Sequence, residues 1–357
     1  MSATWLRVGG GLAVFALIAL AGLAALGGLE FDEALDTFTL VMVVAIPAGI
    51  ATYALIEYAQ TRRIDSITGQ FDTRTLVLMP VAIALNIVLG TAVASALKIP
   101  IYFDSIGTIL VAALAGPLAG AVTGFLANVI WTYLAPPPFG SPFAVPFAVV
   151  AVVVGLMAGT FARWGWLRPR PDSSGRRLLV GGAISIGAVV VMVVIALRAW
   201  LAAADGSSLA PKSDDTAFFI LGWLVVLLVV GTAVGLVVLL VRRRDLAAAY
   251  ILAAGVLTGI VAAFIAAPIA AGLFGGVTGS GADFVIAAFR RAGADLEQAV
   301  LGQSLISDPV DKVITYFVVY LILGAMATRT KARFPQGRYL LPLNESEDVR
   351  DRAAPER

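Results

Sequence analysis

The feature that most limits how this chain can fold is one apolar segment, residues 99–142. It carries a single charged side chain, Asp104, and its proline and glycine residues stand where one apolar run ends and the next begins. Runs of this kind span a bilayer as helices, because no water is there to hydrogen-bond an exposed backbone. The segment is therefore not a soluble loop, and it predicts a membrane protein with a pocket near one face.

The composition of the whole chain supports this interpretation. Of its 357 residues 60% are hydrophobic and 13% are charged, with a mean hydropathy of +0.94, whereas soluble domains carry about 25% charged residues. The net charge of +2 does not indicate nucleic-acid binding, because the arginines cluster in short loops between apolar runs. The chain has neither cysteine nor histidine, which excludes thiolate and imidazole catalysis and the metal sites built from those residues. We expect no catalytic residue, metal or cofactor.

Apolar runs of about 20 residues predict an all-α integral membrane protein with about ten transmembrane helices. The first run is long enough to cross a bilayer, so we interpret it as a retained helix and not as a cleaved signal peptide. Gly116 and Pro117 form the expected end of one helix and start of the next, and the helix before them is short for a full crossing. The predicted helices are residues 8–29, 38–58, 75–97, 105–115, 117–134, 143–161, 178–201, 217–241, 246–274 and 311–328.

Basic side chains indicate which loops face the cytoplasm. Arginines cluster after residues 58, 161, 241 and 328, while the loop after the first helix is acidic. The positive-inside rule therefore predicts a multi-pass protein of the plasma membrane with both termini in the cytoplasm. The polar tail, residues 344–357, is expected to be disordered.

Three blocks of sequence together resemble one transporter family. They are LNIVLGTAVASALKIPIYFDSIGTILVAALAGPLAGAVTGFLANVIW (85–131), GVLTGIVAAFIAAPIAAGLFGGVTGSGADF (255–284) and SLISDPVDKVITYFVVYLIL (304–323). In order and character they are similar to the six-helix substrate-binding (S) component of energy-coupling factor (ECF) transporters, over about half of the chain. The resemblance implies a subunit that captures a vitamin or similar micronutrient at the outer face. It would deliver this substrate through a T component and two ATPase subunits, and would not itself be an enzyme.

The remaining helices look like two pairs added to this core. The predicted organisation is an N-terminal transmembrane hairpin with a cytoplasmic link (1–74), the first part of the core (75–177) and an inserted helix pair (178–244). The second part of the core with an external amphipathic segment (245–335) and a cytoplasmic tail (336–357) follow. The resemblance also implies that the first three core helices face the T component.

Small residues on the first core helix are candidates for contact with that partner. Gly90 and Ala94, and likewise Ala92 and Ala96, are four residues apart. Small residues at this spacing let another helix backbone approach closely in lipid. The same stripe would equally serve packing within the chain.

The loop and helix after that stripe supply the first candidate substrate-binding residues. Asp104 either caps the next helix or lies in the pocket, since the resemblance implies that this loop covers the substrate. Asn128 and Trp131 are three residues apart on one helix face, where an amide beside an aromatic ring can orient a heterocycle. Alternatively, Trp131 and Tyr133 belong to an interfacial aromatic belt.

The third block supplies the other candidates. Asp308 is placed to be the N-cap of the last helix, with Pro309 at its first position. Lys312 does not suit this helix start, because a cation there faces the positive end of the helix dipole. It either pairs with Asp308 four residues earlier or, beside Gln303 and Ser304, meets an anionic or hydrogen-bonding substrate.

Two features lie between the second and third blocks. The sequence GGVTGSG (275–281) resembles a phosphate-binding loop, but it lacks the Lys-Ser/Thr ending and is predicted to be external, which favours a flexible loop. Residues 283–298 have apolar side chains at the spacing of an amphipathic helix. This helix would rest on the membrane surface or cover the pocket.

The sequence favours a capture subunit over three alternatives. No helix centre carries a carboxylate or a lysine, which argues against a proton-coupled secondary transporter. No GxxxxGK[ST] loop is present, in agreement with ATP hydrolysis on separate subunits. A membrane sensor or assembly subunit is disfavoured by the short tail, and an intramembrane enzyme by the lack of catalytic groups. The expected partners are the ECF T component, two ATPase subunits, a small nutrient and the lipid bilayer, but no nucleic acid.

Overall fold

A computed structural model describes residues 2–25, 31–96, 101–170, 187, 216–242, 244–291 and 293–342. Every regular element in these residues is a helix, and none of them forms a strand. The predicted helix of residues 178–201 lies outside the described part, apart from residue 187, as does the tail beyond residue 342. The all-α prediction is confirmed for the part that is described.

The described helices follow the apolar runs of the sequence. Their bounds are α1 Ser2–Ala25, α2 Phe31–Thr61, α3 Asp65–Thr68, α4 Thr73–Gly90, the π-helix η1 Thr91–Ala96, α5 Ile106–Ala115, α6 Pro117–Tyr133, the 3₁₀-helix η2 Val145–Phe147, α7 Ala148–Arg163, α9 Thr216–Val241, α10 Ala247–Phe274, α11 Ala282–Arg291, α12 Leu296–Ala325, α13 Thr328–Ala332 and the 3₁₀-helix η3 Gly337–Leu340.

Four of the described helical segments are long and apolar enough to cross a membrane. They are Asp36–Thr61, Thr73–Val93, Val145–Arg163 and Ala247–Phe274, and the shorter apolar segments are Leu6–Gly22, Ile106–Ala115 and Val230–Val241. These helices are compatible with a membrane location. The described residues thus hold four candidate spans plus shorter apolar helices, where the sequence predicts about ten spans in the whole chain.

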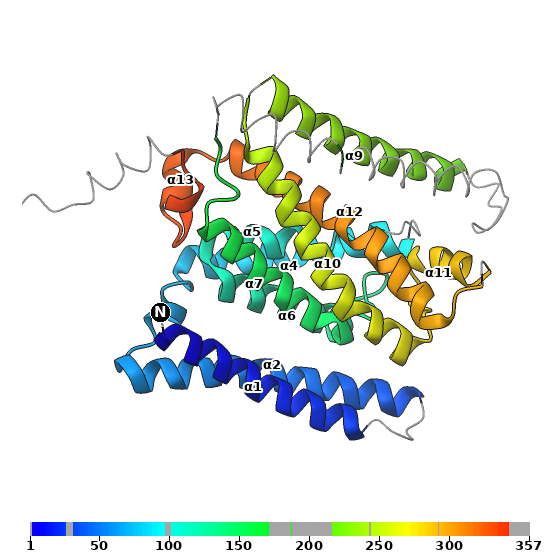
Figure 1. The fold of residues 1–357 in the computed structure, drawn as a ribbon, viewed down its shortest axis with the longest axis horizontal. Coiled ribbons are helices and arrows are strands. Elements are labelled where there is room, and N and C mark those ends of the chain that lie inside the picture. The colour runs from blue at the N-terminus through cyan, green and yellow to red at the C-terminus, as the bar shows by residue number, and fades with distance from the viewer. Residues whose placement is uncertain are drawn as a thin grey trace, which may run out of the picture.

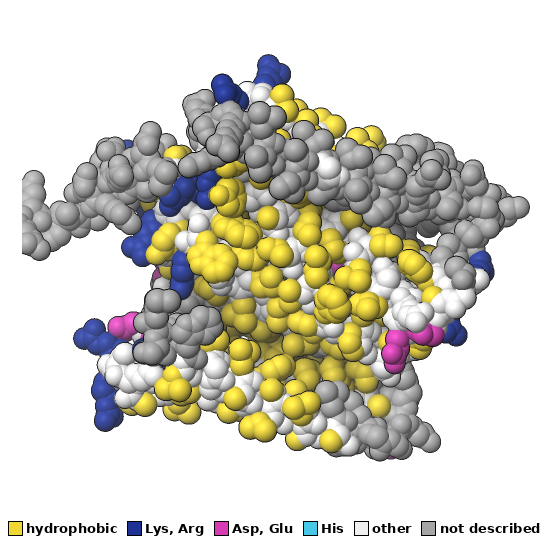
Figure 2. Space-filling model, viewed as in Figure 1, with side chains coloured by type: hydrophobic (Ala, Val, Ile, Leu, Met, Phe, Trp, Pro, Cys, Tyr) yellow, Lys and Arg dark blue, Asp and Glu magenta, His cyan; other side chains and the backbone are white. Residues whose placement is uncertain are grey.

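The helices form layers around a central group (Figure 1). Helices α4, α5, α6, α7, α10 and α12 occupy the middle, α1 and α2 lie side by side below them, and α9 lies on the opposite side. Side chains from α5, α7, α10 and α12 build the largest cluster of buried apolar residues. On the face drawn in Figure 2, hydrophobic side chains cover the middle, and Lys and Arg gather mainly toward the end where α13 lies.

The predicted break between α5 and α6 lies where expected. Gly116 has a φ of +140°, a conformation that residues with a Cβ rarely adopt, and Pro117 opens α6. The side-chain oxygen of Gln70 accepts hydrogen bonds from the backbone N–H groups of Leu118 at 2.9 Å and Ala119 at 3.4 Å. Gln70 thereby supplies the cap that α6 lacks in its own sequence.

The predicted start of the last helix is wrong. Helix α12 begins at Leu296, thirteen residues before Pro309, with Asp295 as the N-cap that accepts from the Gln298 N–H at 2.8 Å. Pro309 is inside the helix, where the bare backbone of Gly259 on α10 adjoins it: a Cβ on this glycine would be 2.3 Å from the Pro309 Cα. Such close packing of a neighbouring helix is one way in which an interior proline is tolerated in membrane helices.

The predicted amphipathic helix over residues 283–298 is also divided. Gly293 has a φ of +97°, which ends α11 after Arg291 and lets the chain turn into α12. The two parts pack against each other.

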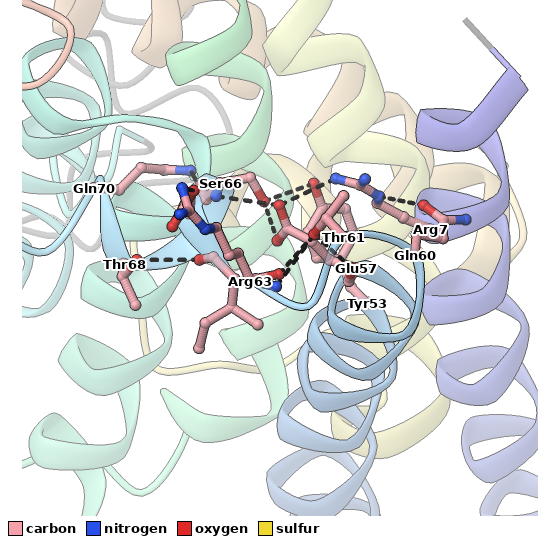
Figure 3. A network of polar contacts seen from close by, with 11 residues as sticks. Arg7, Tyr53, Glu57, Gln60, Thr61, Arg63, Ser66, Thr68 and Gln70 are labelled. Carbon is pink, nitrogen blue, oxygen red and sulfur yellow. Dashed lines mark hydrogen bonds and ion pairs between the residues drawn. The ribbon is translucent and has the colours of Figure 1, made fainter.

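A polar network joins the N-terminal hairpin to the link that follows it (Figure 3). The Arg7 guanidinium on α1 pairs with the Glu57 carboxylate on α2 at 3.0 Å. The other Glu57 oxygen accepts from the Ser66 hydroxyl on α3 at 2.5 Å. Gln70 donates to the Ser66 carbonyl at 2.6 Å, so the same residue that caps α6 also holds α3.

Candidate functional site

A cavity of about 130 Å³ lies among α5, α6, α7, α10 and α12. One water needs roughly 10–15 Å³, so the cavity has room for a small molecule. Side chains from the segment 101–105, from the loop after α10 and from α11 also line it. Its lining includes all seven substrate-binding candidates of the sequence: Asp104, Asn128, Trp131, Gln303, Ser304, Asp308 and Lys312. Residues of the second block, such as Ala262 and Thr278, also line it, so the three sequence blocks converge on one cavity.

Lys312 is bound within the protein. Its ammonium contacts the Asp311 carboxylate, donates to the Ser105 hydroxyl at 2.9 Å and lies 3.8 Å from an Asp104 oxygen. Only 5% of the residue is exposed. The expected pairing with Asp308 is wrong, because Asp311 and Asp104 hold the ammonium instead.

Asp311 is the residue of the site that the sequence interpretation missed. It is fully buried and accepts hydrogen bonds from the N–H groups of Tyr102 at 3.2 Å and Phe103 at 2.9 Å. Phe103 has a φ of +53°, a strained conformation for a residue with a large side chain. Asp311 thus fixes the segment 101–105 against α12 and positions Lys312 at the same time.

Asp104 does not cap α5 as one interpretation proposed. The cap position belongs to Ser105, which makes no side-chain capping bond, and Asn86 on α4 accepts from the Gly107 N–H at 2.7 Å instead. Asn86 also donates to the Thr108 hydroxyl at 2.9 Å. A buried amide in the apolar run of α4 was the sequence signal for this role. Burial raises the pKa of the Asp104 carboxyl above its ordinary value, against the effect of the nearby Lys312.

Trp131 lies inside the protein and not in an aromatic belt. It is 8% exposed, whereas Tyr133 is 59% exposed. Its indole N–H donates to the Phe139 carbonyl at 2.7 Å, which leaves the ring without a free donor. Asn128 donates from its amide nitrogen to the Gly124 carbonyl at 3.0 Å and borders the cavity beside Trp131.

Gln303 provides an unsatisfied donor in the cavity wall. The residue is 2% exposed, and its amide nitrogen has no hydrogen-bond partner among the described residues. Its amide oxygen accepts from the Ser304 hydroxyl at 3.4 Å. A buried polar group without a partner costs about 1–3 kcal/mol, so this amide is held in the cavity wall at a cost in stability.

The loop 275–281 borders the cavity but does not offer a phosphate cradle. The N–H groups of Thr278 and Gly279 donate to the two Asp283 carboxylate oxygens at 3.0 and 2.8 Å. Those groups are the ones that a phosphate would need, and a carboxylate already occupies them. Thr278, Ser280 and the α11 residue Ile286 line the cavity. Helix α11 therefore contributes to the cavity wall, and its position relative to the membrane surface stays a prediction.

Aromatic side chains close the other side of the cavity. Phe143 and Phe147 line it, and the ring of Phe274 lies 5.3 Å from Phe143 and 5.8 Å from Phe147. Phe147 also packs against the buried apolar cluster to which α2 contributes Phe38 and Met42. The N-terminal hairpin therefore supports the aromatic wall from behind.

The small residues of the first core helix are described only in part. Gly90 is buried, and a Cβ there would be 2.2 Å from the Trp131 Cη2, so this glycine packs within the chain. Ala92 is half-buried. The side chains of Ala94 and Ala96 lie outside the described residues.

No family model, curated protein or solved structure matches the chain.

Proposed function

We propose that the chain is the substrate-capture subunit of an ATP-driven importer of the ECF type, which takes up a vitamin or similar micronutrient. The observation that carries the proposal is the convergence on one cavity of seven candidate residues, three from the first sequence block and four in or beside the third. Such a cavity, lined mostly by apolar and aromatic groups with a few convergent polar ones, is the usual form of a small-molecule site. The subunit binds its substrate there and is not an enzyme.

The division of labour is proposed from the position of α11 and of the basic residues. Helix α11 and the loop 275–281, which line the cavity, lie at one end of the helix layer, and Lys and Arg gather mainly at the other end, where α13 lies (Figures 1 and 2). We propose that the substrate enters beside α11 and that the basic end faces the cytoplasm, where the T component and two ATPase subunits associate. In this scheme η1, which continues α4, contributes to the partner contact through Ala92, Ala94 and Ala96, while Gly90 supports the pocket.

The test is a purification of the full chain from its native host in mild detergent, followed by native mass spectrometry. We expect a retained small molecule, or a complex with a T component and two ATPases. Uptake of that molecule by cells should stop when the ATPases are deleted. A chain without ligand or partners, from cells whose uptake continues without the ATPases, would replace the proposal with a secondary transporter.

A ligand-binding chain whose deletion leaves uptake unchanged would indicate a sensor instead.

A further inference from the structure

The cavity has more carboxylates than cations. Asp104 and Asp308 line it, and Asp311 stands directly behind Lys312. Among the described lining residues Lys312 is the one cation. When all four groups are ionised, three negative charges face one positive charge in a setting of low polarity, where unbalanced charge is costly.

Lys312 has little capacity left for an anion. An ammonium has three donors; this one contacts the Asp311 carboxylate, donates to the Ser105 hydroxyl and has an Asp104 oxygen 3.8 Å away, an ion pair beyond hydrogen-bond distance. An anionic ligand that met the remaining donor would also approach the Asp104 and Asp308 carboxylates. The anionic substrate considered from the sequence therefore fits the site poorly.

The Asp308 carboxylate is paired with neither a cation nor a hydrogen-bond donor among the described residues. It is 6% exposed, and no ion pair or hydrogen bond within the described residues uses its carboxylate. It lies on α12 one turn after Ser304 and one turn before Lys312, so these side chains share one helix face at steps of about 6 Å. A positive group on a ligand would meet Asp308 between a hydroxyl and a bound ammonium.

The rest of the wall suits the body of an organic cation. Trp131, Phe143 and Phe147 line the cavity, and aromatic faces attract cations within about 6 Å of the ring. Since the Trp131 N–H is held by Phe139, the ring presents only its apolar surface. No group of three or more acidic side chains placed to hold a metal ion occurs among the described residues, which favours an organic cation over a metal.

We infer that the ligand of this cavity is an organic cation, a small amine or a positively charged nitrogen heterocycle, whose charge is bound by Asp308 and whose body contacts the aromatic wall. The Gln303 amide donates to an acceptor on the same ligand. The inference rests on the proposed function, because it assumes that the cavity is the substrate site.

The test compares small aromatic probes of different charge on the purified full chain in detergent. Benzyltrimethylammonium and 3-picolylamine at pH 7 are the cations, benzyl alcohol is the neutral probe and benzoate is the anion, with affinity read by isothermal calorimetry. We expect the quaternary cation to bind at least tenfold more tightly than benzyl alcohol, and benzoate to bind more weakly still. Equal or tighter binding of benzyl alcohol or benzoate overturns the inference.

A charge-neutral variant sharpens this result. Asp308→Asn should weaken binding of benzyltrimethylammonium at least tenfold and leave benzyl alcohol within twofold. The matched control is Asp65→Asn, whose carboxylate is 73% exposed on α3, outside the cavity. Unchanged cation binding in Asp308→Asn counts against the inference. If this variant does not fold, the probe series on the unaltered chain decides alone.

The two proposals fail in different ways. Preference for a neutral or anionic probe rejects the cation and leaves an ATPase-dependent capture subunit intact. Uptake that continues without the ATPases rejects the capture subunit, while the charge preference of the cavity is measured independently. A folded chain that binds none of the probes rejects the cavity as the site and so rejects the inference.

Discussion

Two polar clusters stand in this otherwise apolar molecule, and they differ in how completely their hydrogen bonds are used. In the network of Figure 3, the Glu57 oxygens receive bonds from Arg7 and from the Ser66 hydroxyl and N–H, and both ends of the Gln70 amide are bound. In the cavity, the Gln303 nitrogen has no partner among the described residues. A closed network holds helices together, whereas an open one is suited to a ligand.

The largest effect is expected at Asp311, whose hydrogen bonds beside the cavity are all made within the protein. Asp311→Ala removes the acceptor of the Tyr102 and Phe103 N–H groups. It also leaves the buried Lys312 ammonium without its Asp311 partner. Breaking a buried ion pair in this way costs about 3–5 kcal/mol. Denaturant unfolding in detergent should therefore show a much lower free energy of unfolding.

The control for Asp311→Ala is Asp65→Ala, whose carboxylate is exposed and whose loss should change stability by less than about 0.5 kcal/mol. Equal stability of the two variants would show that Asp311 does not organise the segment 101–105.

The wall of the cavity is tested by Gly90→Ala. The added methyl would be 2.2 Å from the Trp131 Cη2, so the ring must shift, at a cost of about 1–3 kcal/mol. Both the free energy of unfolding and the affinity for ligand should fall.

Gly272→Ala on α10 is the matched helical control, because nothing lies within 4 Å of its new methyl group. An alanine there, in the last turn of α10, should be neutral or slightly stabilising. If Gly90→Ala behaves like Gly272→Ala, Trp131 is free to move and does not define the pocket.

The closed network is tested by Glu57→Ala. Arg7 and Ser66 lose their acceptor, which should lower the free energy of unfolding by about 1–3 kcal/mol. Ligand affinity should stay within twofold, measured by calorimetry on protein that is still folded. A large loss of affinity would mean that the two clusters are coupled and that the comparison between them fails.

The smallest effect is expected for Gln303→Leu, which should change stability and ligand affinity in opposite directions. Removal of a buried donor that has no partner among the described residues should leave stability unchanged or slightly higher. Affinity for the ligand should fall by about 0.5–1.5 kcal/mol, because the lost amide bonds only in the complex. A variant that loses stability and keeps its affinity would make Gln303 a structural residue.

The sequence predicted those features whose causes are local. The break at Gly116 and Pro117 depends on two adjacent residues, and the structure has it there. The start of α12 was mispredicted because the helix begins at the Asp295 cap and continues through Pro309, which packs against Gly259, a residue fifty positions away on another helix. A pattern of neighbouring residues in the sequence carries no information about that contact between two helices.

The sequence predicted which residues line the cavity better than it predicted which residues they contact. Buried polar side chains in apolar runs are few, which made Asn128, Gln303 and Asp308 visible. Their arrangement was not visible: Asp311 holds residues more than 200 positions away, and Lys312 pairs across to Asp104 and not along its helix to Asp308. The roles in binding stay predictions, as does the resemblance to the ECF family.

Backbone contact between α10 and α12 also determines which parts of the molecule can open. A Cβ on Gly255 would be 2.5 Å from the Val313 Cα, and the same closeness recurs at Gly259 and Pro309. Helices whose backbones are this close have little freedom to slide past each other, so α10 and α12 form one packed unit. The wall that carries Gln303 and Asp308 is therefore the fixed side of the cavity. Residues 101–105 are bound to α12 through Asp311 and belong to the same fixed side. Opening of the cavity would therefore depend on displacement of the loop 275–281 or of α11.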